Sequence, residues 1–221
     1  MPDGLIQLTS SIVECDQCSR LRDHCRHIAQ VKRRAYLDQQ YWGRPVPGFG
    51  DPRARLFILG LAPGAHGANR TGRVFTGDSS GDWLYRALHD TGFANQPAST
   101  HSADGLTLHD CWVSASVRCA PPDNKPTPAE VVTCRSWLEQ ELQLMPQVRV
   151  VVALGRLAFD NYLTLRGLPR VRFHFAHNQP HETHPVLISS YHPSQQNTST
   201  GKLTQPMLRA VFERAREVLH S

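Results

Sequence analysis

Four cysteines of this 221-residue chain have a spacing that suits metal ligation. Cys15 and Cys18 are separated by two residues, so both thiolates can face one ion or cluster. Cys119 and Cys134 are separated by fourteen residues. Structural zinc sites usually contain two closely spaced pairs, whereas an iron–sulfur cluster tolerates irregular spacing. The pattern favours a bound metal or cluster, with buried free thiols as the alternative.

Two cysteines, Cys25 and Cys111, fall outside this set. Cys111 stands at the start of a predicted strand and is expected in the core, whereas Cys25 could compete as a ligand. Residues 1–6 lack the pattern of a signal peptide, and the longest apolar runs, 56–62 and 150–154, are too short to cross a bilayer. We therefore expect a cytoplasmic protein without a membrane span, whose reduced thiols do not form a disulfide scaffold.

A glycine-rich stretch, residues 60–81, carries the next group of reactive side chains. Its glycines allow the backbone to approach a ligand closely, but it lacks the Gly-Lys-Ser/Thr of a Walker A loop and the spacing of a dinucleotide fingerprint. Phe75 could form a slot for a flat heterocycle, and Asp78 could meet a developing positive charge. Asp78 is also placed to cap a following helix, and the two roles are compatible.

A second polar stretch, residues 191–202, is almost uncharged and rich in amides and hydroxyls. Such side chains donate to phosphate oxygens and probe base edges, and a solvated surface loop is the alternative. His192 follows a predicted strand directly, so it is better placed for chemistry than histidines scattered elsewhere in the chain.

These loops need a scaffold that brings them together. Four apolar runs predict strands at 55–59, 112–117, 149–154 and 186–190. Apolar residues at helical spacing predict helices at about 82–89, 127–145 and 205–219, the second opened by a capping box with proline at its first position. The alternation indicates an α/β fold, a three-layer α/β/α sandwich with a central, mostly parallel, four-stranded sheet.

One domain covering residues 1–221 is expected, with an N-terminal helical segment, 1–45, that carries three of the cysteines. Parallel sheets bind ligands at the carboxyl ends of their strands. That rule selects the loops 60–81, 118–126 and 191–202.

The basic residues are biased toward arginine. The net charge is +5, and only three of the 24 basic residues are lysines. The arginine fork suits phosphate, so a polyanionic partner is one explanation, and codon bias in a GC-rich genome is the other.

Several motifs in a fixed order give the chain a family resemblance. They are the Cys15 and Cys18 pair, residues 60–64, 69–73, 75–78 and 118–128, Cys134, and residues 192–198. Over nearly its whole length the chain resembles the uracil-DNA glycosylase superfamily, and most closely family 5, the iron–sulfur branch of broad specificity. The resemblance implies a monofunctional glycosylase, a hydrolase that excises uracil from DNA and leaves an abasic site in base excision repair.

The same resemblance implies a structural 4Fe-4S cluster and a set of site residues. The damaged nucleotide would be flipped out of the duplex, and the segment 193–200 would enter the minor groove. The implied residues are Cys15, Cys18, Cys119 and Cys134 for the cluster; Ala62, Pro63, Gly64 and Phe75 for the base; Asp78, Asn124 and His192 for catalysis; and His66, Arg70, Pro193, Ser194, Gln195, Gln196 and Asn197 for DNA.

Two departures from the wider superfamily bear on the chemistry. Leu61 and Ala62 cannot activate water, an absence that family 5 shares, so that task would pass to Asp78. Residues 112–116 lack the asparagine with which related branches read uracil. We therefore expect loose base selection that includes uracil, hypoxanthine and other deaminated bases.

The expected partner is DNA containing deaminated bases, bound by a monomer at the nucleoid of a prokaryotic cytoplasm. The competing hypothesis is a zinc- or cluster-stabilised nucleic-acid-binding protein without catalysis. A thiol redox sensor is a further alternative, which would need cysteines of low pKa.

Overall fold

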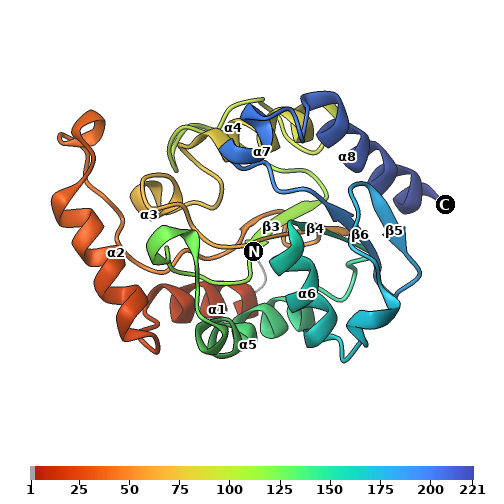
Figure 1. The fold of residues 1–221 in the computed structure, drawn as a ribbon, viewed down its shortest axis with the longest axis horizontal. Helices are drawn as coiled ribbons and strands as arrows, with labels where there is room; N and C mark the ends of the chain where they lie inside the picture. Colours follow the sequence, from red (N-terminus) through yellow and green to blue (C-terminus); the bar gives the residue numbers. More distant parts are fainter. Residues whose placement is uncertain (1–2) are drawn as a thin grey trace.

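Four apolar runs form the centre of the sheet in the computed structural model, which describes residues 3–221 (Figure 1). Almost every residue in these runs is buried, because both faces of the sheet are covered. The sheet order is β1-β3-β2-β4-β6-β5, and the four central strands are parallel. They are β2 (Leu56–Gly60), β3 (Cys111–Ala115), β4 (Val150–Leu154) and β6 (Val186–Ser190).

Two short antiparallel strands complete the sheet at its edges. β1 (Phe49–Gly50) pairs with β3, and β5 (Gln179–His181) pairs with β6. The sheet is therefore mixed and six-stranded, and the predicted four-stranded sheet is wrong in this respect. Strands of two and three residues leave no apolar run or alternation that sequence analysis could detect.

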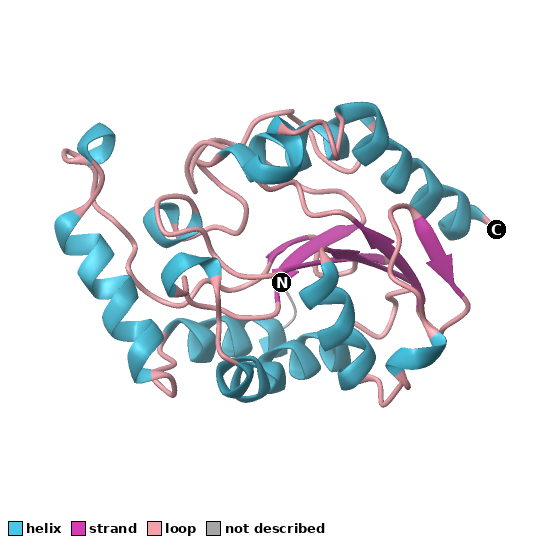
Figure 2. Ribbon diagram, viewed as in Figure 1, coloured by secondary structure: helices cyan, strands magenta, loops and turns pink. Residues whose placement is uncertain are grey.

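Helices cover both faces of the sheet, which gives the predicted three layers (Figure 2). One layer contains α4 (Ser79–Asp90) and α8 (Gln205–His220), and the other contains α1 (Asp3–Val13), α5 (Pro128–Leu144) and α6 (Arg156–Leu165). Successive side chains of a strand point to opposite faces of the sheet and therefore pack against different helix layers. Ile58 packs in the core with α4 and α8, and its neighbour Phe57 packs with α1, α5 and α6.

Helix starts follow their capping residues. The side chains of Thr127 and Glu130 form the predicted capping box of α5. α4 begins at Ser79, before the predicted start near residue 82, because the Asp78 side chain caps it. α6 has no counterpart among the predicted helices.

The N-terminal helices pack into the same cores as the sheet. Leu5 of α1 joins the core that contains α5, and α2 (Ser19–Val31) contributes Leu21 and Cys25 to a smaller cluster with Cys119 and Cys134. The remaining short helices lie in connections: η1 (Arg34–Tyr36), α3 (Ala68–Thr71), η2 (Pro122–Asn124), η3 (Arg170–Arg172) and α7 (Gln195–Ser199). As predicted, Cys111 is fully buried. No helix within residues 3–221 combines the length and apolar character that a membrane span requires.

Candidate active site

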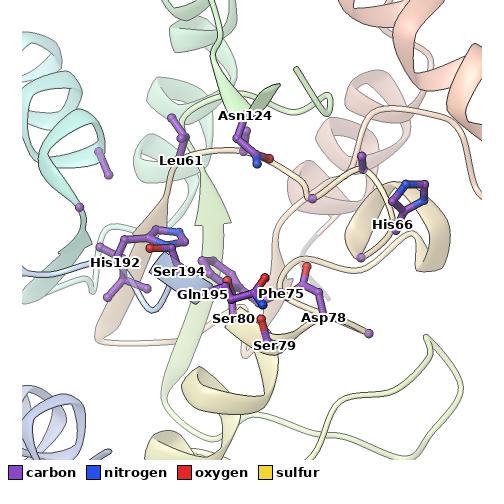
Figure 3. Close-up of a pocket in the computed structure, with 18 of the residues that line it drawn as sticks. Leu61, His66, Phe75, Asp78, Ser79, Ser80, Asn124, His192, Ser194 and Gln195 are labelled. Carbon is purple, nitrogen blue, oxygen red and sulfur yellow. The ribbon is translucent and has the colours of Figure 1, made fainter. Parts of the chain in front are cut away.

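A cleft of about 780 Å³ opens at the carboxyl ends of the parallel strands. Its walls come from the loops that follow all four of these strands, and from residues beyond α2. Phe75, Asp78, Asn124 and His192, which were expected to bind or act on one base, all line it. Figure 3 shows Phe75, Asp78 and His192 on one side of the cleft and Asn124 on the other. The fold therefore brings these separated residues into one site.

The Asp78 carboxyl is fixed by backbone on two sides. Its Oδ1 accepts a hydrogen bond from the Gly81 amide at 3.0 Å, which caps α4. Its Oδ2 lies against Gly64 and Gly67, where a Cβ on Gly64 would be only 2.8 Å away. Burial raises the pKa of Asp78, and the amides of Gly81 and Ser80 partly oppose this increase. The backbone thus orients a carboxylate that remains basic.

The imidazole of His192 is neutral at physiological pH, because burial lowers its pKa to about 4. Asn197 donates a hydrogen bond to the His192 carbonyl at 2.9 Å, while the ring itself has no hydrogen-bond partner among the described residues. Gly155 makes room for this side chain, since a Cβ there would lie 3.2 Å from the His192 Cβ. The ring is therefore free to donate a hydrogen bond to a ligand.

Phe75 provides a flat surface beside His192. The two ring centroids are 5.8 Å apart, and the planes are inclined by 31°. The ring lies over Gly60, where a Cβ would come within 2.7 Å of it, and the Phe75 backbone has a φ of 50°. A bulky residue in this left-handed conformation is strained, so the surrounding loop must hold it there.

The other predicted base-binding residues are Ala62, Pro63 and Gly64, in the loop after β2. Ala62 and Gly64 line the cleft, and Pro63 lies between them in the chain without lining it. Asn124 lies at the end of η2, is exposed and lines the cleft, and its backbone has a φ of 56°. The left-handed conformation is one that asparagine tolerates better than most residues.

Only some of the residues predicted to bind DNA line the cleft. His66, Ser194 and Gln195 line the cleft, whereas Pro193, Gln196 and Asn197 are not among its lining residues. Arg70 is buried rather than presented to solvent. Its guanidinium donates to the carbonyls of His66 at 2.7 Å and Gly77 at 2.8 Å. In this position it holds the glycine-rich loop together.

Comparison with known proteins connects this cleft to a family. Residues 47–216 match the model of the Uracil DNA glycosylase superfamily. The chain belongs to the uracil-DNA glycosylase superfamily. A Type-5 uracil-DNA glycosylase of Mycobacterium leprae is 50% identical to it, over 96% of this chain and 94% of the relative. That of Thermus thermophilus is 47% identical, over 94% of this chain and 95% of the relative. A Type-4 enzyme of Archaeoglobus fulgidus is 28% identical, over 76% of each chain.

The uracil-DNA glycosylase superfamily is a family of hydrolases, and the resemblance to family 5 is confirmed by the Type-5 relatives. Two parts of the site have no counterpart among the predicted residues. Arg33 and Tyr36 reach the cleft from η1 and its flank, and residues 154–158 reach it from β4. Residues 154–158 could have been found from the glycine that directly follows a predicted strand, because ligands bind at the carboxyl ends of all parallel strands, including β4.

All six cysteines of this superfamily member are free. Burial raises the pKa of Cys134 to about 11, and the nearby thiols of Cys15 and Cys18 contribute to the increase. Cys119 lies in the same cluster and shares a hydrogen bond with Cys25, which raises the pKa of Cys119. Within residues 3–221, no group of His, Cys, Asp or Glu side chains already has the geometry of a bound metal ion. The convergence of thiols on one place is nevertheless the donor set that thiolate-bound iron requires.

Proposed function

We propose that this chain hydrolyses the N-glycosidic bond of uracil in DNA, and of other deaminated bases such as hypoxanthine, and leaves an abasic site for base excision repair. The observation that carries the proposal is that Asp78 and His192, from the loops after β2 and β6, line one cleft together with Phe75. Membership of the uracil-DNA glycosylase superfamily supports the same reaction.

The reaction needs an extruded nucleotide, because the glycosidic bond is inaccessible inside the base stack. Phe75 stacks on the extruded base. Its cleft neighbours Leu61, Ala62 and Leu157 are apolar and offer shape rather than hydrogen bonds to the base. A cleft that makes few hydrogen bonds to the base discriminates weakly between the bases that fit into it, which supports a substrate range wider than uracil.

Cleavage builds positive charge on the sugar and negative charge on the leaving base. The Asp78 carboxylate stabilises the sugar side and orients the attacking water, with Asn124 as a second polar group across the cleft. His192 donates a hydrogen bond from its neutral ring to the base, where negative charge develops. Burial makes both interactions stronger than they would be in water.

DNA binding is assigned to the rims of the cleft. His66 lies at one end, and Ser194 and Gln195 lie at the other (Figure 3). Amides and hydroxyls in residues 193–197 suit phosphate and minor-groove contacts. The relatives from Mycobacterium leprae and Thermus thermophilus are prokaryotic, and we propose action at the nucleoid by a monomer.

We propose that Cys15, Cys18, Cys119 and Cys134 hold a 4Fe-4S cluster. When bound, the cluster supplies a structural bridge rather than electrons for the reaction. Contacts between the chain's own residues show which segments such a bridge would connect. Arg118, which directly precedes Cys119, donates its amide to Cys134 Sγ at 3.2 Å, and Arg20 of α2 pairs with Glu130 of α5 at 2.7 Å. α2 is thus joined to α5, and α5 to the loop after β3, which carries Asn124.

The test is incubation of the purified protein with duplexes that each carry one uracil, hypoxanthine or xanthine, followed by alkaline strand scission. We expect abasic product from the uracil duplex at least. Absence of product from every duplex would overturn the enzyme assignment. Iron, sulfide and zinc analysis of the same sample separates the proposal from a zinc-loaded nucleic-acid-binding protein, which would contain zinc and release no base.

A further inference from the structure

Residues 32–40 form a short arm beyond the end of α2, at the edge of the molecule (Figure 1). The helix ends at Val31, Lys32 follows it with a φ of 52°, and η1 begins at Arg34. Lys32 Nζ donates to the Leu37 carbonyl at 3.0 Å, so the arm closes on itself. Arg33 and Tyr36 of this arm line the cleft. The proposed catalytic and base-binding roles leave the arm without a function.

Arg70 anchors the arm to the glycine-rich loop. Its guanidinium lies 4.0 Å from the centroid of the Tyr36 ring and donates to Gln39 Oε1 at 2.5 Å. The same group donates to the carbonyl of Gly77, which directly precedes Asp78. One buried side chain therefore fixes the arm relative to the proposed catalytic carboxylate.

Tyr41 provides a second anchor. Its hydroxyl accepts a hydrogen bond from the Arg33 amide at 3.3 Å and lies 3.0 Å from His66 Nδ1. His66 lines the cleft at the opposite end from Ser194 (Figure 3). The arm is thus held at the end of the cleft that residues 194–197 do not reach.

The arm presents positive charge that the protein itself does not neutralise. Arg33 and Arg34 are both exposed, and in the part of the chain that the structure describes neither guanidinium has an ion pair or hydrogen bond. Asp38 is the one acidic residue of the arm, against three basic ones. The pKa of His66 is lowered by burial and, to a smaller degree, by Arg33 and Arg70, so the positive potential extends to the cleft wall.

We propose that the arm binds the phosphodiester backbone of the damaged DNA strand through Arg33 and Arg34, beside the extruded nucleotide and at the end of the cleft opposite Ser194. The inference rests on the proposed function, because it requires DNA to enter this cleft. Exposed guanidinium groups match phosphate oxygens in charge and in donor geometry. Arg70 contributes indirectly, as a positioning residue for the arm.

The test measures binding of the Arg33→Ala/Arg34→Ala variant to a short duplex that contains a tetrahydrofuran abasic-site analogue, over a series of salt concentrations. We expect a higher Kd than for the wild-type protein. We also expect the slope of log Kd against log salt to decrease by about 0.9 for each phosphate group that the variant no longer neutralises. The Arg33→Lys/Arg34→Lys variant keeps both charges and should retain the wild-type slope.

Arg172→Ala is the matched control, because Arg172 is an exposed arginine of η3 outside the cleft lining. It should bind as the wild type does. Thermal unfolding of each variant at the wild-type midpoint confirms that the fold is retained. A wild-type Kd and slope for Arg33→Ala/Arg34→Ala would overturn the inference.

Uracil excision by the wild-type protein, assayed on the same duplex sequence, separates the two proposals. If the wild-type protein excises uracil and the Arg33→Ala/Arg34→Ala variant binds DNA as the wild type does, only the proposed role of the arm is overturned. If the wild-type protein binds the duplex but does not excise uracil, the glycosylase assignment is overturned. A changed slope of log Kd against log salt for the arm variant would still support DNA binding by the arm.

Discussion

The ring centroids of Phe75 and His192 lie 5.8 Å apart in one wall of the cleft, although the two residues come from loops after different strands. The proposed stacking on a base and the proposed hydrogen bond to its edge would therefore come from one continuous surface. Asp78, three residues after Phe75 in the same loop, faces the same space. Single substitutions can separate the contributions of these groups.

Phe75→Ala removes the stacking surface. Stacking of a base on an aromatic side chain contributes about 1–3 kcal/mol, so we expect the efficiency of uracil excision to fall about 5- to 150-fold. Phe75→Tyr keeps the ring and should retain most of the activity. Equal rates for the two variants in single-turnover assays would show that Phe75 does not stack on the base.

Asp78→Asn separates catalysis from helix capping. Asparagine can still accept the hydrogen bond from Gly81 and cap α4, but it carries no charge. We expect single-turnover excision to fall about 10- to 10⁴-fold, with little change in DNA affinity. For the wild-type enzyme, the rate should fall with decreasing pH at values above 3.8, because burial raises the pKa of Asp78 above that ordinary value. Unchanged excision by Asp78→Asn would exclude Asp78 from catalysis.

His192 should make the folded state sensitive to acid. Above pH 6.5 the imidazole is neutral in the folded and unfolded chain, so it contributes no pH dependence. Between pH 6.5 and about 4 the unfolded chain binds a proton that the folded chain does not, and the free energy of unfolding falls as the pH decreases. Urea unfolding at pH 7 and pH 5 should show a smaller decrease for His192→Ala than for the wild type. Equal decreases would mean that His192 is not protected from protonation.

Asp104→Ala tests the buried ion pair beside the loop that carries Asp78. Arg73 and Asp104 lie 2.7 Å apart, and both side chains are less than a tenth exposed. Arg73 also donates to Thr76 Oγ1 at 3.0 Å, two residues before Asp78. An unpaired buried guanidinium costs about 3–5 kcal/mol in the free energy of unfolding, measured by urea denaturation.

The control for this pair is Glu213→Ala, which breaks the exposed pair of Arg209 and Glu213 on α8. That change should cost at most about 1 kcal/mol. Similar costs for the buried and the exposed pair would contradict the role assigned to Asp104.

Cys119→Ser should remove the proposed cluster. The wild-type protein is expected to be brown and to contain iron and sulfide, whereas the variant should be colourless and unfold at a lower temperature. Cys111→Ala is the control, because Cys111 is buried in the sheet away from the other thiols, and it should keep the colour. Zinc in place of iron in the wild-type protein would contradict the cluster assignment.

The central strands and the loops at their ends could be predicted because each strand contains a run of apolar residues. Once those strands are parallel, their carboxyl ends must meet, and Asp78 and His192 follow into one cleft. The edge strands are too short to leave a pattern. Only the six-stranded sheet shows how the parallel strands are bordered.

Burial and long-range contacts were the parts that the sequence did not reveal. Arg70 is a basic residue in a polar loop and was predicted to contact DNA, yet it is buried against Tyr36 and Gln39. Arg33 precedes the first predicted strand by more than twenty residues and reaches the cleft only because α2 ends beside α3. No local spacing signals either outcome.

Gly67 touches the Asp78 carboxyl so closely that any side chain at position 67 would have to displace it. Under the catalytic role proposed for Asp78, a substitution at this position would abolish the reaction. Efforts to evolve the enzyme toward new lesions should therefore hold position 67 constant. Substitutions should instead be introduced at Leu61 and Leu157, which line the cleft and whose apolar side chains do not hydrogen bond to the Asp78 carboxylate.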